Sequence, residues 1–146
     1  MAKLPLGLTH NVLFASVFGE LTDMRFAAGE TLFSEGEPAD YALYLVQGQV
    51  SILVRFGNDI SATIAQRGAG ELIGEMSLVT GVRCAGACAM EPVTALKVSY
   101  AVIAQLVNAR PDFALALYSL ATERLYEANR SLARCRSTRE GAPTKQ

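Results

Sequence analysis

The segment "GAGELIGEMSLVTGVR" (residues 68–83) contains glycine turns that lead into a carboxylate, Glu75, and a guanidinium, Arg83, eight positions further on. The letters "EMSL" are typical of a single helical turn, and "TG" closes that turn before Arg83 begins another strand. Only apolar, small or hydroxyl residues separate the two charges. Because charges are rarely buried without a partner, we expect them to pair with each other, face solvent or face a bound ligand.

Residue types in this order favour a phosphorylated sugar as the ligand. Successive backbone N–H groups at a helix start, exposed by a glycine, can hold an anion. Arg83 would add a charge-assisted fork for the phosphate, and Glu75 would accept a hydrogen bond from a ribose hydroxyl. A Glu–Arg pair beside a turn is also a common structural or surface ion pair, and the residues alone leave that alternative open.

Short β-rich runs broken by glycine surround this segment between about residues 22 and 98. The runs are "TDMRF", "ETLFS", "YALYLVQ", "QVSILVRF", "ISATIAQ", "CAGACAM" and "VTALKV". The letters "QGQ" and "GND" between them are typical of tight hairpin turns. Seven or eight short strands at this spacing predict a mainly β fold, an antiparallel jelly-roll β-barrel or sandwich.

Helical patterns flank the β region on both sides. Residues 8–20 have helical spacing with Thr9 as a candidate cap, and residues 99–109 have Ser99 in the same position. Pro111 is suited to open a long C-terminal helix, since the chain has no further Gly or Pro until after Cys135. We expect one domain over residues 1–137, with helices at 99–137 and a disordered polar tail at 138–146.

The long C-terminal helix is predicted to carry two stripes of side chains. A stripe suited to docking on the barrel contains Phe113, Leu117 and Leu120. A second stripe with steps of three and four is suited to a partner helix; it contains Tyr118, Ala121, Leu125, Ala128, Leu132 and Cys135. One ordinary amphipathic helix on its own domain is the alternative.

The composition excludes several classes of protein. A formal net charge of −1 argues against direct nucleic-acid binding. No apolar run approaches the roughly 20 residues that span a bilayer, and the N-terminus lacks a secretory pattern. The cysteines at 84, 88 and 135 form no paired framework, and we expect reduced thiols in the cytoplasm.

Catalysis and metal chemistry are disfavoured as well. His10 is the only histidine, which argues against a metal centre of clustered imidazoles, including an enzyme of the cupin type. No Cys or Ser lies in a recognisable setting with a base. We therefore expect a protein that is not an enzyme, has no catalytic residues and carries no cofactor or metal.

Over residues 12–137 the chain resembles the cyclic-nucleotide-binding domain. The matching residues are "FAAGETLFSEGEPADYALYLVQGQVSIL" (26–53) and residues 68–83, which resemble the phosphate-binding cassette of that family. The order "G-x-G-x-x-I" followed by "GEMSL" is a specific signal. We call residues 68–83 the cassette from here on.

The resemblance implies a ligand-binding role for a set of residues in and after the cassette. Gly74 would let the ligand approach the backbone, Glu75 would accept the ribose 2′-hydroxyl, and Arg83 would neutralise the phosphate. The backbone N–H groups of Met76 and Ser77 would bind the phosphate. The full set implied is Ile73, Gly74, Glu75, Met76, Ser77, Arg83, Cys84 and Ala85.

Two registers are open for the arginine, because the family commonly places it nine or ten residues after the glutamate. In the first, the loop has lost a residue, Arg83 binds the phosphate and the turn at 91–92 carries a compensating insertion. Strand alternation then sets Arg83 on one face with Ala85, Ala87 and Ala89. In the second, nothing is gapped and Cys84 takes the arginine position. We prefer the first, because loops absorb length changes more readily than strands.

Two functions follow from these expectations. The first is a cytosolic sensor that binds a cyclic purine nucleotide and signals through its C-terminal helix, as a homodimer or to another partner. Cyclic AMP is favoured over cyclic GMP, because Cys84 and Ala85 offer no hydroxyl to the base; Tyr118 and Tyr126 are possible caps over it. Since about ten polar residues follow Cys135, too few for a helix-turn-helix, the output is expected from another chain. The second function is a degenerate domain of the same fold that binds no nucleotide and acts by dimerisation or protein contact.

Overall fold

The computed structural model describes residue 14, residues 23–58 and residues 60–141. The strands are β1 (Asp23–Phe26), β2 (Thr31–Phe33), β3 (Tyr41–Gln47), β4 (Val50–Phe56), β5 (Ile60–Arg67), β6 (Leu72–Ile73), β7 (Gly86–Ala89) and β8 (Val93–Ser99), and the helices are α2 (Ser77–Thr80), α3 (Tyr100–Ala109) and α4 (Pro111–Gly141). The helix predicted over residues 8–20 lies outside the described residues except for Phe14, and His10 lies outside them entirely.

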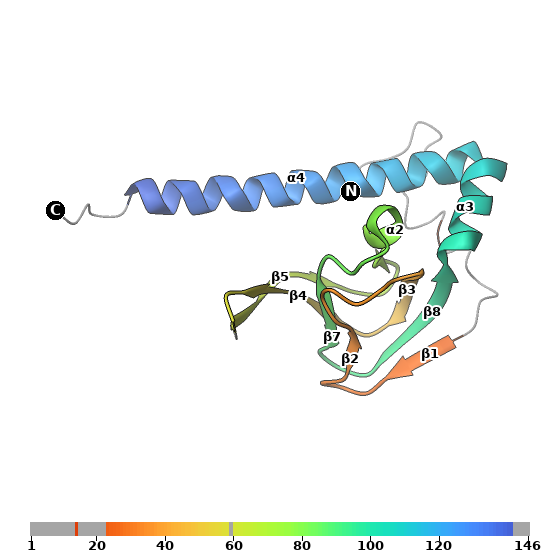
Figure 1. The fold of residues 1–146 in the computed structure, drawn as a ribbon, viewed down its shortest axis with the longest axis horizontal. Coiled ribbons are helices and arrows are strands. Elements are labelled where there is room, and N and C mark those ends of the chain that lie inside the picture. The colour runs from red at the N-terminus through yellow and green to blue at the C-terminus, as the bar shows by residue number, and fades with distance from the viewer. Residues whose placement is uncertain (1–13, 15–22, 59, 142–146) are drawn as a thin grey trace.

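The eight strands form two four-stranded sheets. One sheet has the order β1-β8-β3-β6 and the other β2-β7-β4-β5. All the pairings between these strands are antiparallel. Figure 1 shows the sheets folded against each other below α4, with α3 turning the chain from β8 into α4. The predicted mainly β jelly roll with flanking helices is confirmed.

The sequence of β3 is a nearly continuous apolar run, and the structure shows why. Its residues alternate between two cores. Leu43 and Leu45 pack between the sheets, whereas Ala42 and Tyr44 belong to a second cluster beneath the helices. Because both faces of the strand are covered, four consecutive residues are buried and the letters "YALYLVQ" show little alternation of polarity.

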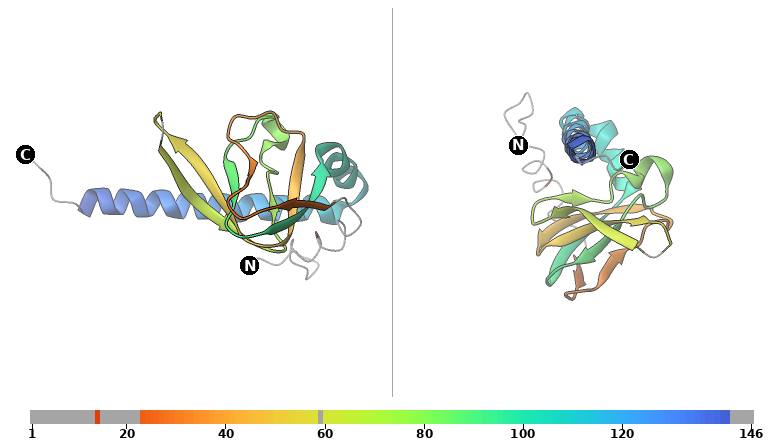
Figure 2. Two further views of the ribbon diagram at one scale, coloured as in Figure 1. Left: turned by 90° about the horizontal axis from the view of Figure 1, so that it is seen from below. Right: turned by 90° about the vertical axis from the view of Figure 1, so that its left-hand side faces the viewer.

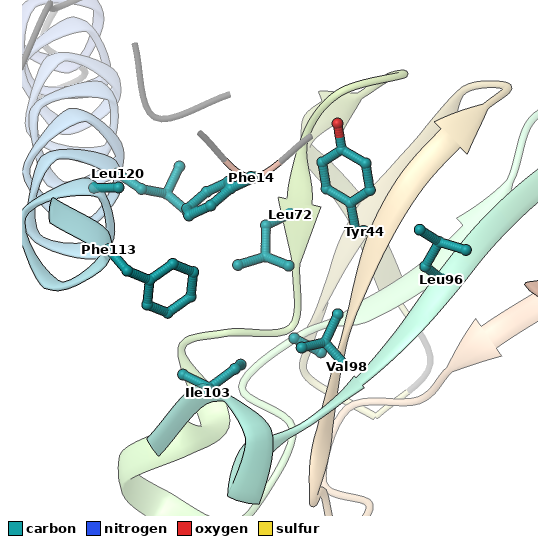
Figure 3. Packing of buried hydrophobic residues seen from close by; sticks show 10 residues of the cluster. Phe14, Tyr44, Leu72, Leu96, Val98, Ile103, Phe113 and Leu120 are labelled. Atoms are coloured by element: carbon teal, nitrogen blue, oxygen red, sulfur yellow. The ribbon is translucent and has the colours of Figure 1, made fainter. Parts of the chain in front are cut away.

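The second cluster attaches the helices to the barrel. Phe113 and Leu120 of α4 are buried, and the ring of Phe14 meets that of Phe113 edge to face at 5.8 Å. Figure 3 shows these side chains pointing toward Leu72 and Val98 of the sheet. The predicted docking stripe is confirmed in Phe113 and Leu120, and Leu117 packs on the cluster half-buried.

Helix termini follow local sequence signals. The Ser99 hydroxyl accepts a hydrogen bond from the Val102 N–H at 3.2 Å, as an N-cap does. Pro111 opens α4, where its missing N–H costs no helical hydrogen bond. The helix continues to Gly141, so residues 138–141 are helical where a disordered tail was predicted; a helix that has already formed adds one backbone hydrogen bond per residue and can extend past its core.

Two details of the β region differ from the predictions. The two-residue strand β6 lies inside the cassette, where no strand was expected. Strand β7 begins only at Gly86, so Arg83 and Ala85 precede it. The expected alternation that places Arg83 on one face with Ala85, Ala87 and Ala89 is therefore wrong. The chain bends at Cys84 and Ala85 before pairing begins.

Helix α4 is 31 residues long, and Figure 2 shows it lying along one side of the barrel and extending well past it. Its exposed portion is rich in charged residues. Among the described residues no helix combines the length and apolar composition needed to cross a lipid bilayer.

Candidate ligand-binding site

A cavity of about 680 Å³ lies where the barrel, the cassette and α4 meet. Its size is within the range of small-molecule sites. The walls are Phe33 of β2, Ile52 of β4, several residues of β5, residues 73–77 of the cassette, residues 84–85, and one face of α4. Figure 1 shows α2 between the barrel and α4, which places the cassette at the helix.

Gly74 takes a conformation at the cavity that other residues would adopt only with strain. Its φ is +79°, in the left-handed region, and an added Cβ would lie 2.5 Å from Arg83 Nη1 and 3.5 Å from the Phe33 ring. The glycine therefore allows the guanidinium to lie directly against the cassette backbone. The sequence predicts that Gly74 lets a ligand approach the backbone; in the structure the group at that place is the Arg83 guanidinium.

Arg83 is almost fully enclosed, with 2% of its surface exposed. Its guanidinium lies 4.1 Å from the centre of the Phe33 ring and 4.7 Å from that of Tyr41. Nη1 donates to the Gly74 carbonyl at 3.2 Å. Nη2 is buried and has no hydrogen-bond partner among the described residues. A buried cation with an unused donor is costly, which makes Nη2 a candidate donor to an anion.

Glu75 pairs with Arg124 of α4 rather than with Arg83. The side chains of Glu75 and Arg124 are 11% and 12% exposed, and Arg124 also donates to the Leu72 carbonyl. The second carboxylate oxygen, Oε2, is buried without a hydrogen-bond partner in the part of the chain that the structure describes. One oxygen is thus held by α4, while the other remains able to accept from a ligand hydroxyl.

The side chain of Tyr100, the first residue of α3, contacts both Gly74 and Arg83. Its hydroxyl donates to the Gly74 carbonyl at 2.6 Å and lies 3.4 Å from Arg83 Nη1. Burial raises the pKa of the Tyr100 phenol above its ordinary value, and the nearby Arg83 charge and a hydrogen bond with Ser77 partly offset this. The phenol is therefore protonated at neutral pH and acts as a donor.

A second ion pair joins the barrel to α4 at the cavity. Arg67 Nη2 of β5 lies 3.2 Å from Glu127 Oε2 of α4, and Arg67 Nη1 lies 4.0 Å from Glu71. Arg67 and Glu127 both line the cavity. Together with the pair of Glu75 and Arg124, they connect α4 to two different parts of the cavity wall.

Seven of the eight residues predicted for the site line this cavity: Ile73, Gly74, Glu75, Met76, Ser77, Cys84 and Ala85. Arg83 does not line the cavity; its Nη1 lies against the Gly74 carbonyl. Tyr118 and Tyr126 do not line the cavity; they are exposed on α4, and Tyr126 accepts a hydrogen bond from Arg130. Cys84 and Cys88 are free thiols. Among the described residues there is no group of three or more metal-ligating side chains.

The sequence reasoning missed the residues that position Glu75 and Arg83. Arg124 is separated from Glu75 by 49 positions, and Tyr100 from Gly74 by 26. The stripes read from α4 placed Ala121, Leu125 and Ala128 against a partner helix, yet the same three residues line the cavity. Tyr41 is the first residue of β3 and precedes the four buried residues of that strand. Nothing in this local sequence indicates that its ring lies against the Arg83 guanidinium.

Comparison with known proteins gives the family. A model of the cyclic nucleotide-binding domain matches residues 23–110. The CRP-like cAMP-activated global transcriptional regulator of Mycobacterium tuberculosis is 27% identical over 120 residues, which are 82% of this chain and 54% of that protein. The chain spans about half the length of the transcriptional regulators that it matches in this way.

Solved structures agree with this result. The catabolite activator protein of Thermus thermophilus superposes with a TM-score of 0.73 at 28% identity, over 86% of this chain and 58% of that one. A cyclic nucleotide-binding domain from Methylobacillus flagellatus has a TM-score of 0.70 at 28% identity, over 85% of this chain and 72% of that one. The family model, these relatives and the two-sheet fold lead to one conclusion: the chain belongs to the cyclic nucleotide-binding domain family.

Proposed function

We propose that the chain is a cytosolic sensor that binds a cyclic purine nucleotide, with cyclic AMP favoured, and signals to another chain through α4. The observation that carries the proposal is a pair of buried, opposite charges beside Gly74, each with one atom that no described residue satisfies. These are Oε2 of Glu75 and Nη2 of Arg83. A ribose hydroxyl and a phosphate oxygen are the complementary groups.

The preference for cyclic AMP rests on two supports. Cys84 and Ala85 line the cavity next to Arg83 and offer no hydroxyl to a base. The transcriptional regulators that the chain resembles are named as cAMP-activated. Cyclic GMP is the second ligand to test.

A role for α4 in signalling is supported by its two connections to the site. The pairs Glu75–Arg124 and Arg67–Glu127 both join the helix to residues that line the cavity. A ligand that binds Glu75 differently in two helix positions would shift α4 between them by that difference in affinity. The exposed stripe of α4 is then the surface that a second copy of the chain, or another partner, would contact.

Titration calorimetry of the whole chain with cyclic AMP and cyclic GMP, from micromolar to millimolar, tests the proposed ligand. We expect binding of cyclic AMP and an accompanying rise in melting temperature, because a ligand that binds only the folded state stabilises it. An absence of heat and of any melting shift with both nucleotides at millimolar concentration would contradict the proposal.

A degenerate domain that acts only by protein contact is the second candidate function. It is favoured by the short distance of eight positions between Glu75 and Arg83 and by the enclosure of Arg83, which does not line the cavity. The same titration separates the two functions, since a degenerate domain would give no nucleotide binding while remaining folded.

Replacing Arg83 with alanine should weaken cyclic AMP binding about 10- to 150-fold. The reason is that a hydrogen bond to a charged group contributes about 1.5–3 kcal/mol. Calorimetric titration measures the change. The matched control is Lys97→Ala, because Lys97 Nζ also lies 4.7 Å from the Tyr41 ring but Lys97 is exposed. We expect the control to bind normally. Unchanged affinity for Arg83→Ala would place the phosphate elsewhere and favour the register with Cys84.

A further inference from the structure

The proposed function assigns no role to the hydroxyl group of Tyr100. Its hydroxyl lies between the Gly74 carbonyl, at 2.6 Å, and Arg83 Nη1, at 3.4 Å. Arg83 Nη1 also donates to that same carbonyl at 3.2 Å. The phenol, the guanidinium and the cassette backbone therefore form a closed triangle of polar contacts in a largely buried place.

This triangle leaves one end of the guanidinium unused. Nη1 donates to the cassette carbonyl and lies within reach of the phenol, while Cζ lies over the Phe33 and Tyr41 rings. Nη2 has no hydrogen-bond partner among the residues described. Contacts on several sides restrict the rotamers of Arg83, and a restricted group loses less entropy when it binds an anion.

The place of Tyr100 in the chain adds a connection. It is the first residue of α3, its backbone N–H donates to the Asp40 carbonyl at 2.8 Å, and α3 leads directly to α4 through Arg110. Its side chain thus links the start of the helical segment to the cassette carbonyl, 26 positions earlier in the chain.

We infer that Tyr100 is a positioning residue that holds Gly74 and Arg83 in the arrangement that binds the ligand's phosphate and ties that arrangement to the start of α3. The inference rests on the proposed function, since it concerns the same ligand. Tyr100 would not touch the nucleotide; it would act through the carbonyl of Gly74 and through Nη1 of Arg83.

The test removes only the hydroxyl, with Tyr100→Phe in the whole chain, and measures cyclic AMP affinity by calorimetry. We expect affinity to fall about 3- to 12-fold, the size of a typical hydrogen-bond contribution. The matched control is Tyr41→Phe, which removes a hydroxyl from the neighbouring aromatic residue but keeps the ring face on which Arg83 lies. The control should bind as the wild type does.

A double-mutant cycle distinguishes positioning from general structural support. In the Arg83→Ala background, Tyr100→Phe should cost less affinity than in the wild-type background, because Arg83, one of the two groups that Tyr100 positions, is gone. An equal loss in both backgrounds, or an unchanged affinity in the wild-type background, would overturn the inference while leaving the proposed function intact. A wild type that binds no cyclic nucleotide would instead overturn the proposed function and this inference with it.

Discussion

Replacing Arg124 with methionine should lower the free energy of unfolding by about 3 kcal/mol, as expected when one partner of a mostly buried ion pair is removed. Methionine keeps most of the apolar stem of the side chain, so the loss reports the charge. Glu75 would remain as a carboxylate with 11% exposure and no cation to compensate it, and the Leu72 carbonyl would lose its donor. Urea unfolding at neutral pH measures the change.

Two further variants make the Arg124 result specific. Arg130→Met removes a charge from the same helix, but Arg130 is exposed and contacts Tyr126, so we expect less than about 0.5 kcal/mol. The double variant Arg124→Met with Glu75→Gln removes both charges and should recover part of the stability, because it leaves no buried ion unpaired. Equal unfolding curves for Arg124→Met and the wild type would show that the pair does not stabilise the fold.

The ligand-binding consequence of Arg124→Met differs from the stability consequence. Glu75 Oε1 would no longer be held by α4, and the carboxylate could rotate away from the ligand or toward solvent. The variant therefore also tests whether α4 positions the group proposed to bind the ribose hydroxyl. Cyclic AMP titration of the variant, at a temperature where it is fully folded, measures this effect separately.

Much of the fold could be predicted because its signals are local. Glycines mark turns such as the one between β3 and β4, where Gly48 has a φ of +98° and an added Cβ would lie 2.4 Å from the Pro92 carbonyl oxygen. Ser99 and Pro111 mark the starts of α3 and α4 through rules that involve only neighbouring residues. Strand β6 was missed because two residues carry no periodicity.

The site could be predicted only in part, since its charges are completed from distant segments. The cassette residues lie together because they are consecutive, and a local motif was enough to identify them. The partners of Glu75 and Arg83 come from α4, α3, β2 and β3, and only the tertiary fold brings them to Gly74. The position of Arg83 also depends on the residue at which β7 begins. The alternation of small residues in the sequence does not determine that residue.

The exposed face of α4 allows a sharp test of self-association. Tyr118, Leu125 and Leu132 recur every seven residues and are 72%, 62% and 61% exposed. Large apolar side chains with this spacing are typical of a helix that pairs with another helix. Leu125 also lines the cavity, as does Ala128, so substitutions at these two positions would affect ligand and partner together. Tyr118 and Leu132 are not among the residues that line the cavity, and they are the better choice.

We expect the wild type to form dimers and the double variant Tyr118→Glu with Leu132→Glu to be monomeric. In a dimer the variant would bring four carboxylates to the seam, and like charges in an interface cost several kcal/mol, which corresponds to a dissociation constant raised about 100-fold or more. Cyclic AMP affinity should be unchanged apart from any coupling to dimerisation. Sedimentation velocity of both proteins, with and without cyclic AMP, measures the oligomeric state.

The control for this variant adds the same charge away from the seam. Gln105→Glu with Asn108→Glu places two carboxylates on exposed positions of α3 and should leave association unchanged.

A wild type that sediments as a monomer at high micromolar concentration in both ligand states would contradict the dimer, and the apolar stripe would then be the surface for a different protein. If the wild type dimerises and the double variant does too, the second copy contacts another face of the chain. If the ligand shifts the wild-type equilibrium and leaves the variant monomeric, α4 carries the signal, because the ligand can change association only through a difference in affinity between the two helix positions.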